Sequence, residues 1–188
     1  MFEAIKAYDN LIEKTSNLIR TLKIYPKVFE KDEHEYLHAF FDRNLYNALC
    51  QLDLIIGLKY LDVSQAVNNK IEANYFGRIV AHSSHEILDD LNKMVGRDIR
   101  NYVIDKHEKS YLDKIDSSVK SLNKIKKDYF KTLKEIRHNL FGHKLKEGHQ
   151  QAEMIVKVDN KEIYKIGNEI FKKQNDLLKN FIELIEKI

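Results

Sequence analysis

The chain has 188 residues, with a net charge of +3, six Gly, one Pro and a single Cys. So few turn-forming residues argue against an all-β fold, and the lone Cys50 excludes a disulfide framework within one chain. Charged residues make up 32% and hydrophobic residues 43%, which is typical of a globular domain that buries its own core.

Apolar residues recur at spacings of three and four along most of the chain, which is the period of amphipathic helices. Pro26 follows the first such segment, Asp32 and Glu35 have capping-box spacing before the second, and Gly96 ends the third. Capping-box spacing recurs at Asp159 before the last segment. The pattern predicts helices at about 2–23, 33–62, 70–95, 97–107, 110–146, and from the Asp159 cap to about 187.

These segments predict an all-α fold, a single up-and-down helical bundle of about five to six helices in one domain, 1–188. In the longest segment the apolar residues form a narrow seam of bundle or coiled-coil type, interrupted only at Lys126. The first residues lack the pattern of a signal peptide, and the most apolar stretch, 48–61, contains polar and charged residues. We therefore expect a cytoplasmic protein with no membrane partner.

Lysine supplies 26 of the 32 basic residues, and with 21 Ile and 15 Asn this is the composition that A/T-rich codons produce. The total charge is therefore weak evidence for a partner, but its distribution says more. Residues 119–149 hold nine basic and three acidic residues, a net charge of +6, which leaves −3 for the rest. Such a helix can bind a polyanion such as RNA, or it is simply a solvated face. The candidate RNA-binding residues are Lys127, Lys131, Lys134 and Lys144.

This basic helix leads into a segment, EIRHNLFGHK, that holds Arg137, His138, Asn139 and His143 within seven residues. Successive residues of a regular helix turn by about 100°, so Asn139 and His143 fall on the side of the apolar seam while His138 points away. The long side chain of Arg137 can reach the same side. Ionisable groups beside a buried seam are costly unless they are paired or used, which makes this segment the candidate site.

Arg137 to His143 has the pattern R-x5-H, with Gly142 before the His. This resembles the R-x(4–6)-H motif of HEPN proteins, which are all-helical bundles with the motif on a late helix. Many HEPN proteins are metal-independent endoribonucleases of toxin–antitoxin, abortive-infection and other antiviral defence systems, and they usually dimerise so that two motifs form one cleft.

The resemblance implies RNA cleavage by attack of a 2′-hydroxyl on its own phosphate, without a metal or other cofactor. His143 would be the general base or acid, and Arg137 would stabilise the phosphate in the transition state. Asn139 or His138 would orient the phosphate or the imidazole. The family's polar residue directly follows the Arg, which is His138, whereas the helical geometry favours Asn139.

Two other pairs have similar spacing, because Arg78/His85 and Arg100/His107 both match R-x6-H. We prefer the later motif for its Gly–His step, its position on a late helix and the basic helix that precedes it. His82 and His85 share a helix face, where a structural role is the simpler interpretation.

Two metal-site patterns also occur. The segment from His34 to His38 matches the H-E-x-x-H pattern of zinc peptidases, but Glu35 already has a capping role and no sheet is present to hold a substrate. The pairs Glu35/His38 and Glu135/His138 have the E-x-x-H spacing of di-iron bundles. Such a site needs two further inward carboxylates, for which the candidates are Glu13, Glu72 and Glu86.

The leading hypothesis is a metal-independent endoribonuclease of the toxin–antitoxin or abortive-infection type. Its expected partners are RNA, a second copy of the chain in a homodimer, and an antitoxin or other regulatory protein. The second hypothesis is a non-catalytic HEPN-like module that binds a protein partner through the same seam. The third is a metal-binding four-helix protein.

Overall fold

The computed structural model describes residues 2–24, 35–93, 97–105, 109–141 and 159–185, and no strand occurs within these ranges. The elements are α1 (Phe2–Ile24), α2 (Glu35–Ala66), α3 (Lys70–Asp90), the short 3-10 helix η2 (Leu91–Lys93), α4 (Arg97–Asp105), α5 (Lys109–Phe141) and α7 (Asn160–Ile185). The predicted all-α fold is confirmed, and each expected helix overlaps a described one. The expected helix ends at 33, 95, 107, 146 and 187 lie outside the described residues. None of the described helices is long and apolar enough to span a membrane.

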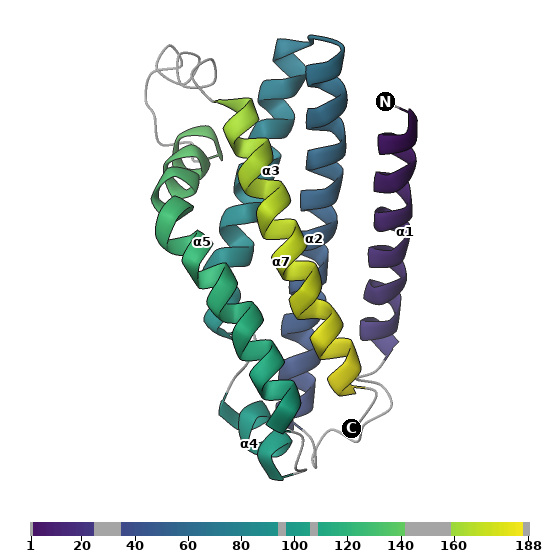
Figure 1. Cartoon of the computed structure of the whole chain (residues 1–188), viewed down its shortest axis with the longest axis vertical. Coiled ribbons are helices and arrows are strands. Elements are labelled where there is room, and N and C mark those ends of the chain that lie inside the picture. Colours follow the sequence, from purple (N-terminus) through teal and green to yellow (C-terminus); the bar gives the residue numbers. More distant parts are fainter. Residues whose placement is uncertain (1, 25–34, 94–96, 106–108, 142–158, 186–188) are drawn as a thin grey trace.

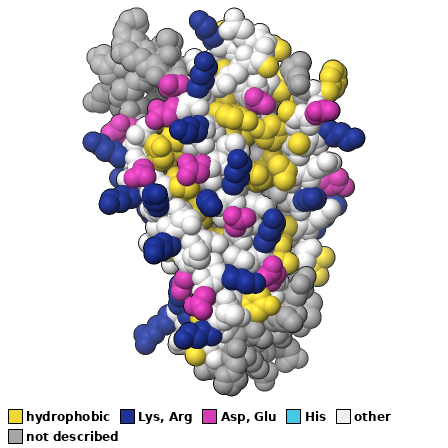
Figure 2. Space-filling view, in the orientation of Figure 1, with side chains coloured by type: hydrophobic (Ala, Val, Ile, Leu, Met, Phe, Trp, Pro, Cys, Tyr) yellow, Lys and Arg dark blue, Asp and Glu magenta, His cyan; other side chains and the backbone are white. Residues whose placement is uncertain are grey.

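Successive long helices run in opposite directions, so the chain forms an up-and-down bundle (Figure 1). α3 packs against α2, α5 and α7, and α7 also packs against α2 and α5, which places four helices around one core. α1 lies along α2 at the side of this group, and α4 lies at one end. Figure 2 shows the face formed by α5 and α7, where charged side chains of both signs surround apolar patches.

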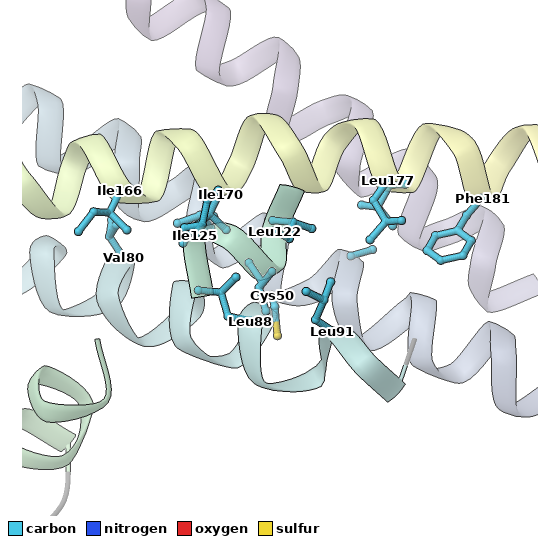
Figure 3. Packing of buried hydrophobic residues seen from close by; sticks show 14 of the residues in the cluster. Cys50, Val80, Leu88, Leu91, Leu122, Ile125, Ile166, Ile170, Leu177 and Phe181 are labelled. Atoms are coloured by element: carbon cyan, nitrogen blue, oxygen red, sulfur yellow. The ribbon is translucent and has the colours of Figure 1, made fainter. Parts of the chain in front are cut away.

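The core is built from the apolar faces of these four helices. In Figure 3, Ile166, Ile170, Leu177 and Phe181 of α7 point toward side chains of the neighbouring helices. Each of the four is at most 1% exposed. Full burial of a side chain of this kind stabilises a fold by about 1.5–3 kcal/mol. Gly167 permits the close approach of α7, because a Cβ there would lie 2.5 Å from Cγ1 of Val80 on α3.

The apolar seam of α5 is more continuous than the sequence pattern indicated. The expected interruption at Lys126 is bridged by Ile125, which is 4% exposed and belongs to the core. Lys126 lies beside the seam instead, with its Nζ 4.7 Å from the ring centre of Phe130. The remaining buried apolar residues of this seam are Leu112, Ile115, Leu122 and Leu133.

Polar side chains mark where two of the helices begin. Asn69 Oδ1 accepts a hydrogen bond from the backbone N–H of Glu72 at 3.2 Å and so caps α3. Asp159 Oδ1 accepts hydrogen bonds from the second and third N–H groups beyond it, at 2.9 and 3.2 Å, which confirms the predicted cap of α7. The predicted signals at Asp32 and Gly96 lie outside the described residues.

Candidate functional site

Arg137 lies near the end of α5, and its side chain reaches across to α3. Its Nη2 is 2.9 Å from Oε1 of Glu86. The Arg137 side chain is 39% exposed and that of Glu86 is 21% exposed, so the pair lies at the surface of the α3–α5 interface. The sequence pattern indicated Glu86 only as a candidate metal ligand, and this ion pair was not predicted.

The second oxygen of Glu86 is held by a third helix. The hydroxyl of Tyr46 on α2 donates a hydrogen bond to Oε2 of Glu86 at 3.1 Å. Desolvation of this hydroxyl, together with the neighbouring Cys50 and Glu86, raises the pKa of Tyr46 above its usual value. Tyr46 therefore stays protonated at neutral pH and remains a donor. The result is a chain of polar contacts, Tyr46–Glu86–Arg137, across α2, α3 and α5.

His85 lies beneath this chain of contacts and is only 3% exposed. Its ring stacks on Phe130 of α5, with ring centres 4.6 Å apart and an interplanar angle of 20°. Its Nδ1 is 3.5 Å from Oε1 of Glu86. Burial and the positive charge of Arg137 lower the pKa of His85, although Glu86 acts in the opposite direction. A neutral, buried imidazole fits the structural role that was predicted for this residue.

The two rival R-x6-H pairs use their arginines for other contacts. Arg78 lies over the ring of Tyr75, with Cζ 5.5 Å from the ring centre. Arg100 on α4 donates to both carboxylate oxygens of Asp116 on α5, at 2.5 and 3.1 Å, and this pairing lowers the pKa of Asp116. The pairing ties α4 to α5. His107 lies outside the described residues.

The remaining residues of the predicted motif are only partly within the described structure. His138 and Asn139 belong to α5, but their side chains are not among those described. His143 and Lys144 lie outside the described residues. The structure therefore gives defined contacts for one member of the motif, Arg137, and the roles of all four residues stay predictions.

Five lysines form a row along the exposed side of α5. Lys120, Lys124, Lys127, Lys131 and Lys134 recur at alternating spacings of four and three residues, and all are exposed. From the rise and turn of an α-helix, the row is about 21 Å long and lies within an arc of about 80°. None of the five forms an ion pair with another described residue. We call these residues the lysine row, and basic side chains follow the α5 edge in Figure 2.

The predicted metal patterns find no ligand set in the described part of the chain. No group of three or more His, Cys, Asp or Glu lies close enough there to hold a metal ion. His34 is outside the described residues, and the side chain of Glu35 is not among those described. Cys50 is a buried free thiol, and burial raises its pKa to about 11, so it is unreactive at neutral pH.

A cavity of about 290 Å³ lies at the end of the bundle where α2 passes into α3 and α7 begins. Ser64, Asn69, Asp159 and Asn160 are among its lining residues. It is separate from the Arg137 site, since about 24 Å of α3 lies between Lys70 at the cavity and Glu86.

Comparisons of this chain with family models, with curated proteins and with solved structures find no match. The resemblance to HEPN proteins thus depends on the motif and the helical architecture alone.

Proposed function

We propose that this protein is a metal-independent endoribonuclease that binds RNA along the lysine row and cleaves it beside Arg137. The lysine row is the observation that carries the proposal. Like charges three and four residues apart destabilise a helix by a few tenths of a kcal/mol per pair. None of the five lysines forms an ion pair with another described residue, although Asp128 and Glu135 lie on the same helix. A polyphosphate backbone offers the complementary charge along such a length.

Arg137 supplies the second supporting observation. Within the described structure only its Nη2 is used, by Glu86, and its side chain is more than one-third exposed. A guanidinium carries five N–H donors in a planar fork, so the unused edge can donate to two oxygens of one phosphate. In the proposed reaction, this edge faces the phosphate that is attacked.

The proposed reaction is transesterification within the RNA. The 2′-hydroxyl loses its proton to a base, its oxygen bonds to the adjacent phosphorus, the bond from phosphorus to the 5′-oxygen breaks, and that oxygen takes up a proton. We assign the proton transfers to His143 and the stabilisation of the crowded phosphate to Arg137. His138 or Asn139 would orient the reacting groups. These roles, and a homodimer in which two motifs share one cleft, come from the HEPN resemblance.

Cleavage of a labelled RNA in EDTA tests the proposal. We expect the wild-type protein to cut the RNA. An oligonucleotide of the same sequence that contains 2′-deoxyribose should not be cut. Arg137→Ala and His143→Ala should each lower the rate by about a hundredfold or more, while at pH 7.5 their cooperative thermal unfolding and their sedimentation stay close to those of the wild type. Arg20→Ala, on α1, is the matched control and should cleave normally.

Two results would decide against parts of this proposal. Undiminished cleavage by His143→Ala would remove the assigned acid–base residue. Absence of any RNA cleavage by the wild-type protein, with tight binding to a protein partner, would support the second candidate, a non-catalytic interaction module. The ion pair with Glu86 is the observation that favours this second candidate, because it gives Arg137 a purely structural use.

A further inference from the structure

Among the described residues, Glu86 is the one carboxylate that contacts the candidate catalytic arginine, and both of its oxygens have a partner. Oε1 accepts from Arg137 at 2.9 Å and Oε2 accepts from Tyr46 at 3.1 Å. The three residues come from three different helices, so the position of the guanidinium is fixed by the packing of the bundle and not by α5 alone. Among the described residues, the guanidinium is therefore contacted at one edge only.

Two effects of Glu86 oppose each other. A carboxylate beside Arg137 offsets the positive charge that would attract a phosphate. The same carboxylate fixes the orientation of a long side chain, which otherwise loses rotamer freedom when a phosphate binds. At a partly exposed site, solvent screens the effect of the Glu86 charge on a bound phosphate. Solvent does not screen the effect of Glu86 on the orientation of the Arg137 side chain. Orientation should therefore be the larger effect here.

We propose that Glu86 and Tyr46 are positioning residues that align the guanidinium of Arg137 with the phosphate to be cleaved. This inference rests on the proposed function and extends it to two residues that lie outside the predicted motif. Tyr46 acts through Glu86, because its hydroxyl donates to the carboxylate oxygen that Arg137 does not contact in the described structure. Neither residue touches the substrate.

The first test does not require RNA. Nitrogen-15 NMR of the protein should show Arg137 side-chain N–H signals with slowed rotation of the guanidinium, assigned by their loss in Arg137→Lys. We expect these signals to average like those of a free arginine in Glu86→Ala and to persist in Glu86→Gln, whose amide oxygen can still accept. Freely averaging Arg137 signals in the wild-type protein would overturn the inference, whatever the RNA assays show.

The second test uses cleavage kinetics. Glu86→Ala should lower kcat by about tenfold to a hundredfold with KM changed by less than about threefold, since a misplaced group mainly affects the transition state. Glu86→Gln should stay within about threefold of the wild type, and Tyr46→Phe should lose about threefold to tenfold. In an Arg137→Ala background, Glu86→Ala should have no further effect. Faster cleavage by both Glu86 variants would instead show that charge offset dominates and would overturn the positioning role.

Asp116→Ala is the matched control, because it breaks the other arginine–carboxylate pair on α5, with Arg100. It should leave kcat and KM unchanged. Thermal unfolding of each variant separates a loss of folding from a loss of positioning. If Arg137→Ala abolishes cleavage but Glu86→Ala does not reduce it, the proposed function stands and the positioning role falls.

Discussion

α5 and α7 pack against each other over the same core, yet their exposed sides are built differently. On α7, exposed residues spaced by three and four alternate in charge: Glu162, Lys165, Glu169, Lys172, Asp176, Lys179 and Glu183. Opposite charges at this spacing stabilise a helix by about 0.2–0.5 kcal/mol per pair. The corresponding positions of α5 are the lysine row. A codon bias toward lysine would act on both helices, so it explains the supply of lysine but not why five lysines follow one another at this spacing on α5 while the charges alternate on α7.

The largest expected effects test whether the two helices are equivalent in the fold. Leu133 on α5 and Leu177 on α7 are both 0% exposed. We expect Leu133→Ala and Leu177→Ala each to lower the free energy of unfolding by about 2–5 kcal/mol in urea titrations. A much smaller loss for Leu133→Ala would make α5 a loosely attached arm, and its exposed side could then not be compared with that of α7.

The next test removes equal charge from both helices. We expect Lys127→Gln, Lys131→Gln and Lys134→Gln together to weaken RNA binding about tenfold to a hundredfold. The slope of log affinity against log salt concentration should become shallower by about 2, because each phosphate contact on a single strand contributes about 0.7. Fluorescence anisotropy with a labelled RNA at several salt concentrations measures both quantities.

The matched control is a triple substitution on α7, made at Lys165, Lys172 and Lys179 with the same change to Gln. It lowers the net charge by the same amount and should change RNA affinity by less than about threefold. Equal losses from the two triple variants would show that RNA responds to total charge and that the lysine row is not a binding surface.

The helices and the excess of basic residues on α5 could be predicted because each depends on the pattern within one segment. The pattern predicted a break in the seam at Lys126, whereas Ile125, one position earlier, is buried there. A helical wheel drawn over a helix this long does not resolve a shift of one position. The contact of Arg137 with Glu86 could not be predicted, because it depends on the register of α3 against α5 and no local pattern encodes that register. Tyr46 was missed for the same reason, since it meets Glu86 only through the packing of α2.

Smaller effects on stability and RNA affinity are expected when a lysine row is created on α7. Glu169→Lys with Asp176→Lys turns four opposite-charge neighbours into like-charge neighbours, which should lower the free energy of unfolding by about 1–2 kcal/mol. RNA affinity should rise by less than about tenfold, since the new row has no Arg137 beside it. A gain as large as the loss from the triple variant of α5 would mean that any lysine row on this bundle binds RNA equally well.

The smallest expected effect is on the pH dependence of stability, and it depends on the buried polar side chains beneath α5 and α7. α5 covers His85 through Phe130, whereas on α7 the buried Gln174 donates to the side chain and backbone oxygens of Asn47, and neither group titrates. Because the pKa of folded His85 is lowered, the unfolded chain takes up this proton first as the pH falls. The contribution of His85 is therefore fully present above its unfolded pKa of about 6.5 and decreases as the pH falls toward its folded pKa.

We accordingly expect Tm to fall between pH 7.5 and 5.5 in the wild-type protein and to fall less in His85→Gln, measured by thermal unfolding at constant ionic strength. Gln174→Leu, beneath α7, should lower Tm by a similar amount at every pH and keep the wild-type pH dependence. Arg137, Glu86 and Asp89 set the charge around His85, and Arg137→Ala should reduce the pH dependence because removing a positive neighbour raises the folded pKa. If Tm changed with pH as strongly in His85→Gln as in the wild type, the pH dependence would belong to other groups. His85 would then contribute nothing to it.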